Sequence, residues 1–124
     1  IVTQFCFAAA PITAWLRRVR AQGIDIPIRV GLAGPASLVT LFRYAMRCGV
    51  GNSLHVLTEN PSFAKALVDR GPELIICDMI AALSEQEQSR LGIAALHFYL
   101  FGGLSKTLDW IDAVRTRRPT YAGA

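Results

Sequence analysis

Residues 2–35 read VTQFCFAAAPITAWLRRVRAQGIDIPIRVGLAGP and contain a strand, a helix and a second strand in succession. The first part, residues 2–7, is β-branched and aromatic, as expected of a buried strand. Apolar side chains then recur at helical spacing over residues 11–22, a segment that begins with proline and is closed by glycine. Residues 27–32 return to a strand pattern. This order predicts two parallel strands joined by a right-handed crossover.

Several helices are predicted after the second strand. A tight strand-to-helix loop with Gly31, Gly34 and Pro35 leads to an amphipathic helix over residues 37–46, with Gly49 and Gly51 as its end. An extended helical region comes next. Its signals are a helix start at Asn60-Pro61, a break at Gly71-Pro72, a helix over residues 73–83 and a capping box formed by Ser84 and Glu87.

The last predicted unit is a strand over residues 94–101 and a helix over residues 104–114. The helix has an apolar stripe, expected to face inward, formed by Leu104, Leu108, Ile111 and Val114. Residues 1–118 are interpreted as one structural unit and residues 119–124 as a polar tail. The pattern predicts an α/β fold with parallel strands and extra helices. Because a parallel sheet of three strands has two open edges, we expect further chain or a partner to complete it.

Charge and composition exclude several classes of protein. The net charge is +4, with the arginines gathered at Arg17, Arg18 and Arg20 and again at Arg115, Arg117 and Arg118. These positions suit the solvated faces of surface helices, and no aromatic residues are interleaved as in a nucleic-acid interface. No apolar run reaches the roughly 18–20 residues that span a bilayer, and the N-terminus has no signal-peptide pattern.

The cysteines and histidines do not form a metal pattern. Cys6, Cys48 and Cys77 are odd in number and lack CxxC spacing, which argues against a disulfide framework and a zinc site. They are interpreted as buried thiols in a reducing cytoplasm. His55 has no metal-like neighbours and is interpreted as structural or exposed.

Four segments in order resemble the methylenetetrahydrofolate reductase family. They are Thr3-Gln4-Phe5-Cys6-Phe7, Gly23-Ile24-Asp25-Ile26-Pro27-Ile28, Val30-Gly31-Leu32-Ala33-Gly34-Pro35 and Ala95-Leu96-His97-Phe98-Tyr99. They are similar to the family's TQF strand, its GID linker, its glycine- and proline-containing loop and its final HFY strand. The resemblance covers residues 2–118.

The resemblance implies the last three βα units of a (β/α)8 TIM barrel. It implies an FAD-dependent oxidoreductase of one-carbon metabolism and methionine biosynthesis that interconverts 5,10-methylenetetrahydrofolate and 5-methyltetrahydrofolate, with NAD(P)H as a further candidate electron donor. The expected site is the C-terminal face of the strands. The family's catalytic acid and most FAD contacts belong to earlier units, so we expect them upstream of this chain. Where the family has a polar Asn-Arg pair after HFY, this chain reads Phe101-Gly102-Gly103.

The resemblance points to Gln4, Tyr99 and Tyr44 as the folate-binding residues. The Gln4 amide offers both a donor and an acceptor for a pterin ring, and an unpaired amide would be costly on an apolar strand. Tyr99 could stack on a flat ring and donate a hydrogen bond at the barrel mouth. Tyr44 aligns with a family aromatic, although its spacing from Leu41 also suits simple packing. A core tyrosine or a solvent-facing glutamine is the structural alternative.

Other residues with reactive side chains are less distinctive. His97 has the same direction as Tyr99 by strand periodicity, but a structurally bonded histidine is the simpler interpretation. Asp78 and Asp109 have no acidic partner at useful spacing. The glycines at positions 31 and 34 lack the rest of a dinucleotide fingerprint, so loop geometry is their expected role.

Two other functions stay open. The chain could be a non-catalytic α/β fragment that folds only by forming a homo-oligomer or by pairing with a missing N-terminal half. It could also be a basic nucleic-acid-binding domain, which would bind with strong salt dependence.

Overall fold

The computed structural model describes residues 1–117, with the backbone but not the side chains of residues 51–53. These residues form three strands and seven helices. In chain order they are β1 (Val2–Cys6), α1 (Ala9–Ala21), β2 (Ile28–Ala33), α2 (Leu38–Arg47), α3 (Gly51–Glu59), α4 (Pro61–Arg70), α5 (Glu73–Ala82), α6 (Glu85–Arg90), β3 (Ile93–Tyr99) and α7 (Leu104–Thr116). The prediction of a mixed α/β fold with parallel strands is confirmed.

The three strands form one parallel sheet in the order β1-β2-β3. The two faces of this sheet differ. Ile28, Val30 and Leu32 of β2 are buried on the face covered by helices. On the other face, the aligned row Val2, Arg29 and Ala95 is exposed across all three strands.

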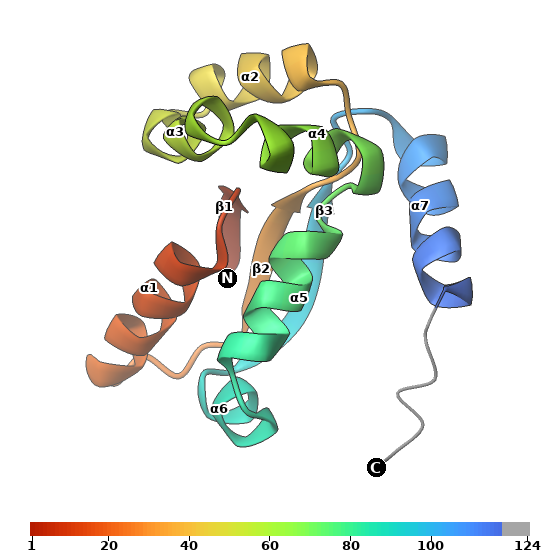
Figure 1. The fold of residues 1–124 in the computed structure, drawn as a ribbon. Helices are drawn as coiled ribbons and strands as arrows, with labels where there is room; N and C mark the ends of the chain where they lie inside the picture. Colours follow the sequence, from red (N-terminus) through yellow and green to blue (C-terminus); the bar gives the residue numbers. More distant parts are fainter. Residues whose placement is uncertain (118–124) are drawn as a thin grey trace.

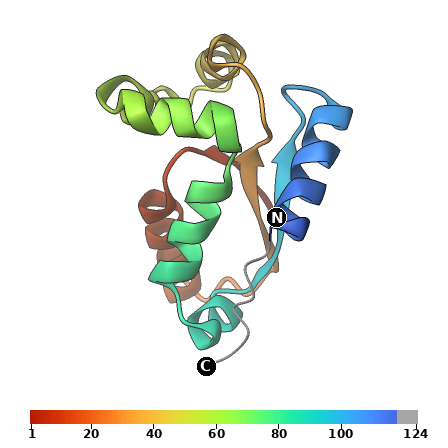
Figure 2. The ribbon, with the colours of Figure 1, turned by 45° about the vertical axis from the view of Figure 1, so that its right-hand side comes forward.

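The helices lie in two groups around the sheet (Figures 1 and 2). Helices α1 and α5 lie beside the strands, and α6 lies near the end where the strands begin. Helices α2, α3 and α4 lie together over the opposite end, toward which the arrowheads point. Helix α7 flanks β3, and its Trp110 donates a hydrogen bond to the Arg70 carbonyl at 2.6 Å and packs edge-on against Phe98.

Two hydrophobic clusters follow from this arrangement. One joins the carboxyl ends of the strands to α2, α3 and α4, with Phe5, Phe7 and Leu41 among its most buried members. The other joins the strands to α1 and α5 and contains Leu16 and Met79. Burying such apolar side chains stabilises the fold by roughly 1.5–3 kcal/mol each. The first cluster therefore fixes α2–α4 over the carboxyl ends of the strands.

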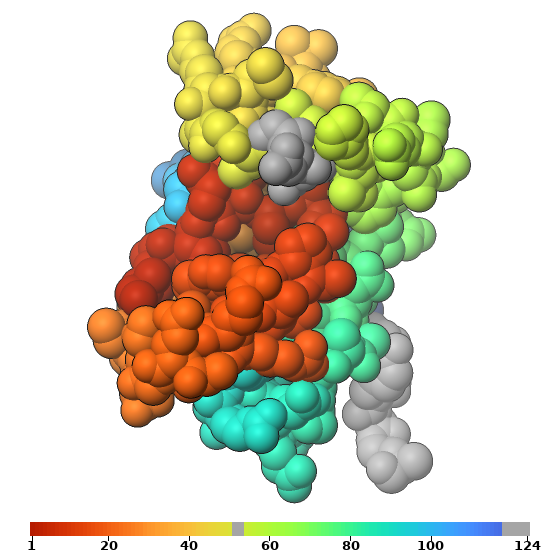
Figure 3. All heavy atoms as spheres, turned by 90° about the vertical axis from the view of Figure 1, so that its left-hand side faces the viewer, coloured from red at the N-terminus to blue at the C-terminus, as the bar shows by residue number. Residues whose placement is uncertain are grey.

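The prediction that the arginines of α1 lie on a solvated outer face is partly wrong, because it fails for Arg20. Figure 3 shows α1 spread over one side of the molecule with α6 below it. Arg17 on this surface pairs with Glu87 at 3.4 Å, as a solvated face permits. Arg20 is partly buried, and its guanidinium donates to the carbonyls of Leu91 at 2.9 Å and Ile26 at 3.0 Å, and to that of Ile24. Arg118 lies outside the described residues, as does the predicted tail of residues 119–124.

Several predicted boundaries move. The third strand ends at Tyr99 rather than at residue 101, because the Phe101 amide turns back to bond the Tyr99 carbonyl at 2.9 Å. Gly31 lies inside β2 rather than in the following loop. Gly49 follows the end of α2 with a positive φ of 69°, as predicted, but Gly51 begins α3 instead of ending α2.

Two predictions of burial are wrong. Leu104 and Leu108 of α7 are 59% and 49% exposed, because α7 uses Thr107 and Trp110 for its inward contacts and no other described element covers the leucines. Cys48 and Cys77 are exposed, because each lies on the outer side of a helix end or helix. All three cysteines are free thiols.

Candidate functional site

The residues predicted to bind folate come from three segments that meet near the carboxyl ends of the strands. Tyr99 is the last residue of β3, and its ring lies against Gly31 on the neighbouring strand. A Cβ atom at position 31 would lie 2.9 Å from the Tyr99 Cε2 atom, so glycine is required for this close approach. The Tyr99 hydroxyl donates a hydrogen bond to the Thr3 carbonyl at 2.9 Å, which ties β3 to β1 across β2.

Phe101 brings Tyr99 and Tyr44 together. Its ring stacks on Tyr44 with centroids 4.1 Å apart and planes inclined by 12°. It also stacks on Tyr99 at 5.7 Å and 19°. Phe5 packs edge-on against both Tyr99 and Phe101, at 5.7 and 4.9 Å. We call these four residues, Phe5, Tyr44, Tyr99 and Phe101, the aromatic cluster. Phe101 was missed in the sequence, although the alternation of aromatic rings at positions 97, 99 and 101 is a signal for it.

Gln4 lies on β1 beside this cluster, but the reason given for its importance is wrong. Its side chain is exposed, so no desolvation penalty argues for a partner. Its Oε1 atom accepts a hydrogen bond from the Phe5 amide at 3.1 Å. Only the oxygen of the side-chain amide can accept, so this bond fixes the Gln4 amide with its NH2 group turned away from the backbone.

Thr3 was not singled out from the sequence, yet it is the buried polar residue of this region. Its hydroxyl accepts from the Gly31 amide at 2.8 Å and donates to the Gln4 carbonyl at 2.9 Å. The pairing of β1 with β2 shifts register between Val2 and Phe5, so the Thr3 hydroxyl supplies an acceptor where the backbone ladder is interrupted. A bulge of this kind cannot be read from residue types alone.

His97 faces the same side as Tyr99, as predicted from strand periodicity. Their rings meet edge to face with centroids 4.9 Å apart. Within residues 1–117 the imidazole makes no hydrogen bond, so the interpretation as a structurally bonded histidine is not supported by a protein partner there. His55 is exposed on α3, as one of its two interpretations expected.

Acidic residues lie elsewhere. Asp78 on α5 and Asp109 on α7 are both exposed. Within the described part of the chain, no group of three or more histidine, cysteine or acidic side chains is placed to hold a metal ion.

Cys6 is a thiol whose acidity is perturbed by its surroundings. Burial raises the pKa of the Cys6 thiol from 9.0 to about 11, and a hydrogen bond from the Ala8 backbone offsets part of that rise. Its Sγ atom lies 3.7 Å from the Gly31 carbonyl oxygen. A thiol with a raised pKa is a poor nucleophile, so Cys6 is a packing residue.

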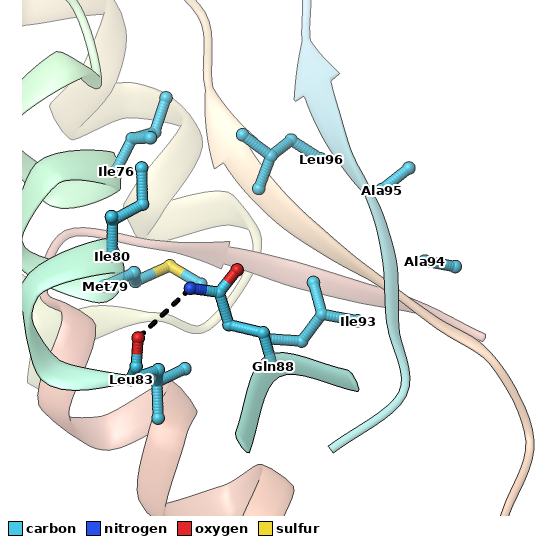
Figure 4. Close-up of a pocket in the computed structure, with 9 residues that line it drawn as sticks. All are labelled: Ile76, Met79, Ile80, Leu83, Gln88, Ile93, Ala94, Ala95 and Leu96. Atoms are coloured by element: carbon cyan, nitrogen blue, oxygen red, sulfur yellow. Dashed lines mark hydrogen bonds between the residues drawn. The ribbon is translucent and has the colours of Figure 1, made fainter. Parts of the chain in front are cut away.

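Two cavities lie away from the aromatic cluster. A groove of about 210 Å³ runs between α5 and β3 (Figure 4), where the Gln88 amide donates to the Leu83 carbonyl at 3.1 Å. Its other lining residues are apolar: Ile76, Met79, Ile80, Leu83, Ile93, Ala94, Ala95 and Leu96. An open cleft of about 580 Å³ lies at the start of α1 and includes Phe7, Thr13 and Asp78. Neither cavity contains Gln4, Tyr44 or Tyr99.

The comparison with known families gives no assignment. No family model matches the chain. No helix among residues 1–117 is both long and apolar enough to cross a membrane. The case for function therefore depends on the residues at the strand ends and on their geometry.

Proposed function

We propose that this chain is the C-terminal part of a (β/α)8-barrel flavoenzyme that interconverts 5,10-methylenetetrahydrofolate and 5-methyltetrahydrofolate. The observation that carries the proposal is the aromatic cluster at the carboxyl ends of parallel strands, with the Gln4 amide beside it. Flat aromatic surfaces bordered by a few directed polar groups are typical of sites for planar ring ligands. The segments that resemble the reductase family supply Gln4, Tyr99 and Tyr44 to this region.

The sheet supports the barrel part of the proposal. Its strands follow chain order and are all parallel, as neighbouring strands of a barrel must be. The exposed row Val2, Arg29 and Ala95 lies on the face opposite the covering helices and would line the inside of a closed barrel. The outer edges of β1 and β3 are where further strands would pair.

In this proposal the chain binds and orients the folate. Tyr44 and Tyr99 each stack on Phe101, at 12° and 19°, and all three residues are only partly buried, so a pterin could pack against the remaining aromatic surface. Gln4 would donate from its NH2 group to a ring oxygen or nitrogen. When bound, FAD would supply hydride transfer. The resemblance assigns most FAD contacts and the catalytic acid to earlier units of the barrel, so we assign no flavin contact and no proton transfer to the described residues.

One observation favours a second candidate, a non-catalytic α/β fragment that requires a partner. The leucines at positions 104 and 108 of α7 are 59% and 49% exposed, and a row across one sheet face is exposed as well. Exposed apolar surface of this kind marks a place for protein contact. This candidate has no catalytic role and folds only by forming a homo-oligomer or by pairing with a missing half.

Direct binding of 5-methyltetrahydrofolate, measured by equilibrium dialysis, tests the proposal. We expect the chain to bind this folate, and we expect Gln4→Ala and Tyr99→Leu each to weaken binding tenfold or more, about the loss of one charge-free hydrogen bond or one stacked ring. His55→Ala, which changes an exposed residue on α3, is the matched control and should bind normally. Absence of folate binding by the unaltered chain would exclude the proposed substrate.

A visible absorption spectrum then tests whether the redox site forms from this chain alone. The chain is mixed with FAD, and 5-methyltetrahydrofolate is added without oxygen. Flavin that is bound and bleaches would mean that the redox site forms from this chain, by self-association if necessary. Free, unbleached FAD together with folate binding would mean that the flavin and the catalytic acid come from another segment.

A further inference from the structure

We propose that Thr3 is a positioning residue that commits the Tyr99 hydroxyl to one orientation, so that Tyr99 meets a ligand as a hydrogen-bond acceptor. The inference deepens the proposed folate site and rests on it for the identity of the ligand. Its geometric part, the control of Tyr99 by Thr3, depends only on the described residues.

The first step is the hydroxyl of Thr3, which has one hydrogen. That hydrogen is donated to the Gln4 carbonyl at 2.9 Å, and a lone pair accepts from the Gly31 amide at 2.8 Å. Thr3 is only 9% exposed, so losing either partner would leave a buried polar group unsatisfied. The hydroxyl therefore holds β1 and β2 together at the register shift and fixes where the Thr3 carbonyl points.

The second step is the Tyr99 hydroxyl, which also has one hydrogen. It is donated to the Thr3 carbonyl at 2.9 Å, while the ring is held against Gly31. The phenol oxygen retains lone pairs and has no further hydrogen to give. The expectation that Tyr99 donates to a ligand is thereby replaced: toward a ligand, Tyr99 can only accept.

The third step is the contrast with Gln4. Its Oε1 atom already accepts from the Phe5 amide at 3.1 Å and keeps one lone pair, while its NH2 group offers two N–H donors. An acceptor from Tyr99 and donors from Gln4 suit a planar ligand that presents an N–H group beside a carbonyl. The lactam edge of a pterin has this chemistry, and a ring without an N–H group would leave the Tyr99 lone pairs unpaired.

The ligand-free test uses NMR of the full chain. Thr3→Val keeps the shape of the side chain and removes the hydroxyl. We expect the Gly31 amide to exchange with solvent about tenfold faster, because its acceptor is lost. We also expect the ring-current shift of the Gly31 α protons to shrink as Tyr99 moves. Thr3→Ser, which retains a hydroxyl, should preserve both signals.

The control is Thr13→Val on α1. Thr13 is also buried, and its hydroxyl donates to the Ala10 carbonyl at 3.0 Å within the same helix. Thr13→Val should leave the Gly31 amide exchange and ring-current shift unchanged. The comparison distinguishes a specific role of Thr3 in positioning Tyr99 from the general effect of losing a buried hydroxyl. If Thr3→Val does not fold, Tyr99→Phe replaces it. That variant removes the bond from the Tyr99 hydroxyl to the Thr3 carbonyl, which Thr3→Val leaves in place, and should reduce the ring-current shift while Gly31 exchange stays slow.

Folate binding completes the test. Thr3→Val and Tyr99→Phe should each weaken 5-methyltetrahydrofolate binding about tenfold, while Thr3→Ser and Thr13→Val bind normally. The inference would be overturned if Thr3→Val left the Gly31 amide exchange and ring-current shift unchanged. It would also be overturned if Thr3→Val changed both and folate binding stayed the same. Absence of folate binding by the unaltered chain would instead remove the proposed function, and the Gly31 signals alone would then decide whether Thr3 positions Tyr99.

Discussion

Arg20 illustrates how a single side chain can fix one end of the sheet. It donates to the carbonyls of Leu91, Ile24 and Ile26, close to the places where β2 and β3 begin. A lysine ammonium has no planar fork and cannot serve the same three acceptors. We expect Arg20→Lys to lower the free energy of unfolding by about 1–3 kcal/mol in urea denaturation followed by circular dichroism. Arg18→Lys, on the exposed side of the same helix, is the control, and equal stability of the two variants would contradict this role.

Cys6 gives a pH dependence with a defined sign. The pKa of its thiol is about 11 in the folded chain against 9.0 ordinarily, so the folded state keeps its proton where the unfolded state loses it. Below pH 9 the thiol is neutral in both states and the contribution to stability is complete. The free energy of unfolding should therefore fall as the pH rises from 9 toward 11, through this group.

The measurement compares the unaltered chain with Cys6→Ser, whose hydroxyl does not titrate in this range. Urea denaturation at a series of pH values should show the unaltered chain losing stability more steeply than the variant above pH 9. Cys48 and Cys77 are exposed and contribute alike to both proteins. Parallel curves would show that Cys6 ionises equally in the folded and unfolded states.

For individual residues, the sequence identified some site residues for sound reasons and missed others. Tyr99 and His97 could be placed on one side of β3 by strand periodicity alone. Thr3 could not, because its role depends on a register shift in a pairing between segments far apart in the chain. The importance of Gln4 was argued from burial that the structure does not show, so its candidacy depends on the reductase resemblance and on its bond to Phe5.

Among the elements, α6 offers a test of local sequence signals. The capping box read from Ser84 and Glu87 is confirmed: the Ser84 hydroxyl accepts from the Glu87 amide at 3.2 Å, and the Glu87 carboxylate accepts from the Ser84 amide at 3.4 Å. Ser84→Ala should lower the free energy of unfolding by about 1 kcal/mol, because the first-turn amide loses its acceptor. Thermal unfolding of both variants is the measurement. Ser89→Ala, which changes an exposed residue later in α6, should have little effect.

The strands and most helices were predictable because their signals are local. Alternating or continuous apolar runs marked all three strands, and Asn60-Pro61 marked the start of α4, where the Asn60 side chain accepts from the Phe63 amide at 3.0 Å. Helix α3 was not separated from its neighbours, because it begins at Gly51, a residue that usually ends helices. Local composition does not distinguish a glycine that stops one helix from one that starts the next.

For the whole molecule, position relative to other elements overrides periodicity. The apolar stripe of α7 was assigned inward because amphipathic helices usually bury their apolar face. Leu104 and Leu108 are instead exposed, and Trp110 makes the inward contact. The stripe was read correctly as a pattern, but periodicity does not say which surface, if any, covers it. Within the described residues, the three-stranded parallel sheet likewise leaves two edges without a further strand.

The exposed surfaces of α7 and of the sheet edges predict association between chains. An exposed apolar stripe on α7 and open sheet edges at β1 and β3 expose surface that a stable monomer would normally bury. We expect light scattering after size-exclusion chromatography to give more than one chain mass for the unaltered protein. Replacing Leu104 and Leu108 with lysine should shift the distribution toward monomer, because charged side chains would have to be desolvated in the contact.

The control for this last experiment is a pair of lysine substitutions on a different exposed apolar surface, at Val39 and Met46 of α2, both 69% exposed. If they shift the distribution as strongly as the α7 pair, association is non-specific and α7 has no special part in it. A folded, unaltered chain that stays monomeric at every concentration would contradict the need for a partner. The three strands would then be a complete sheet, and the barrel proposal would lose its structural support.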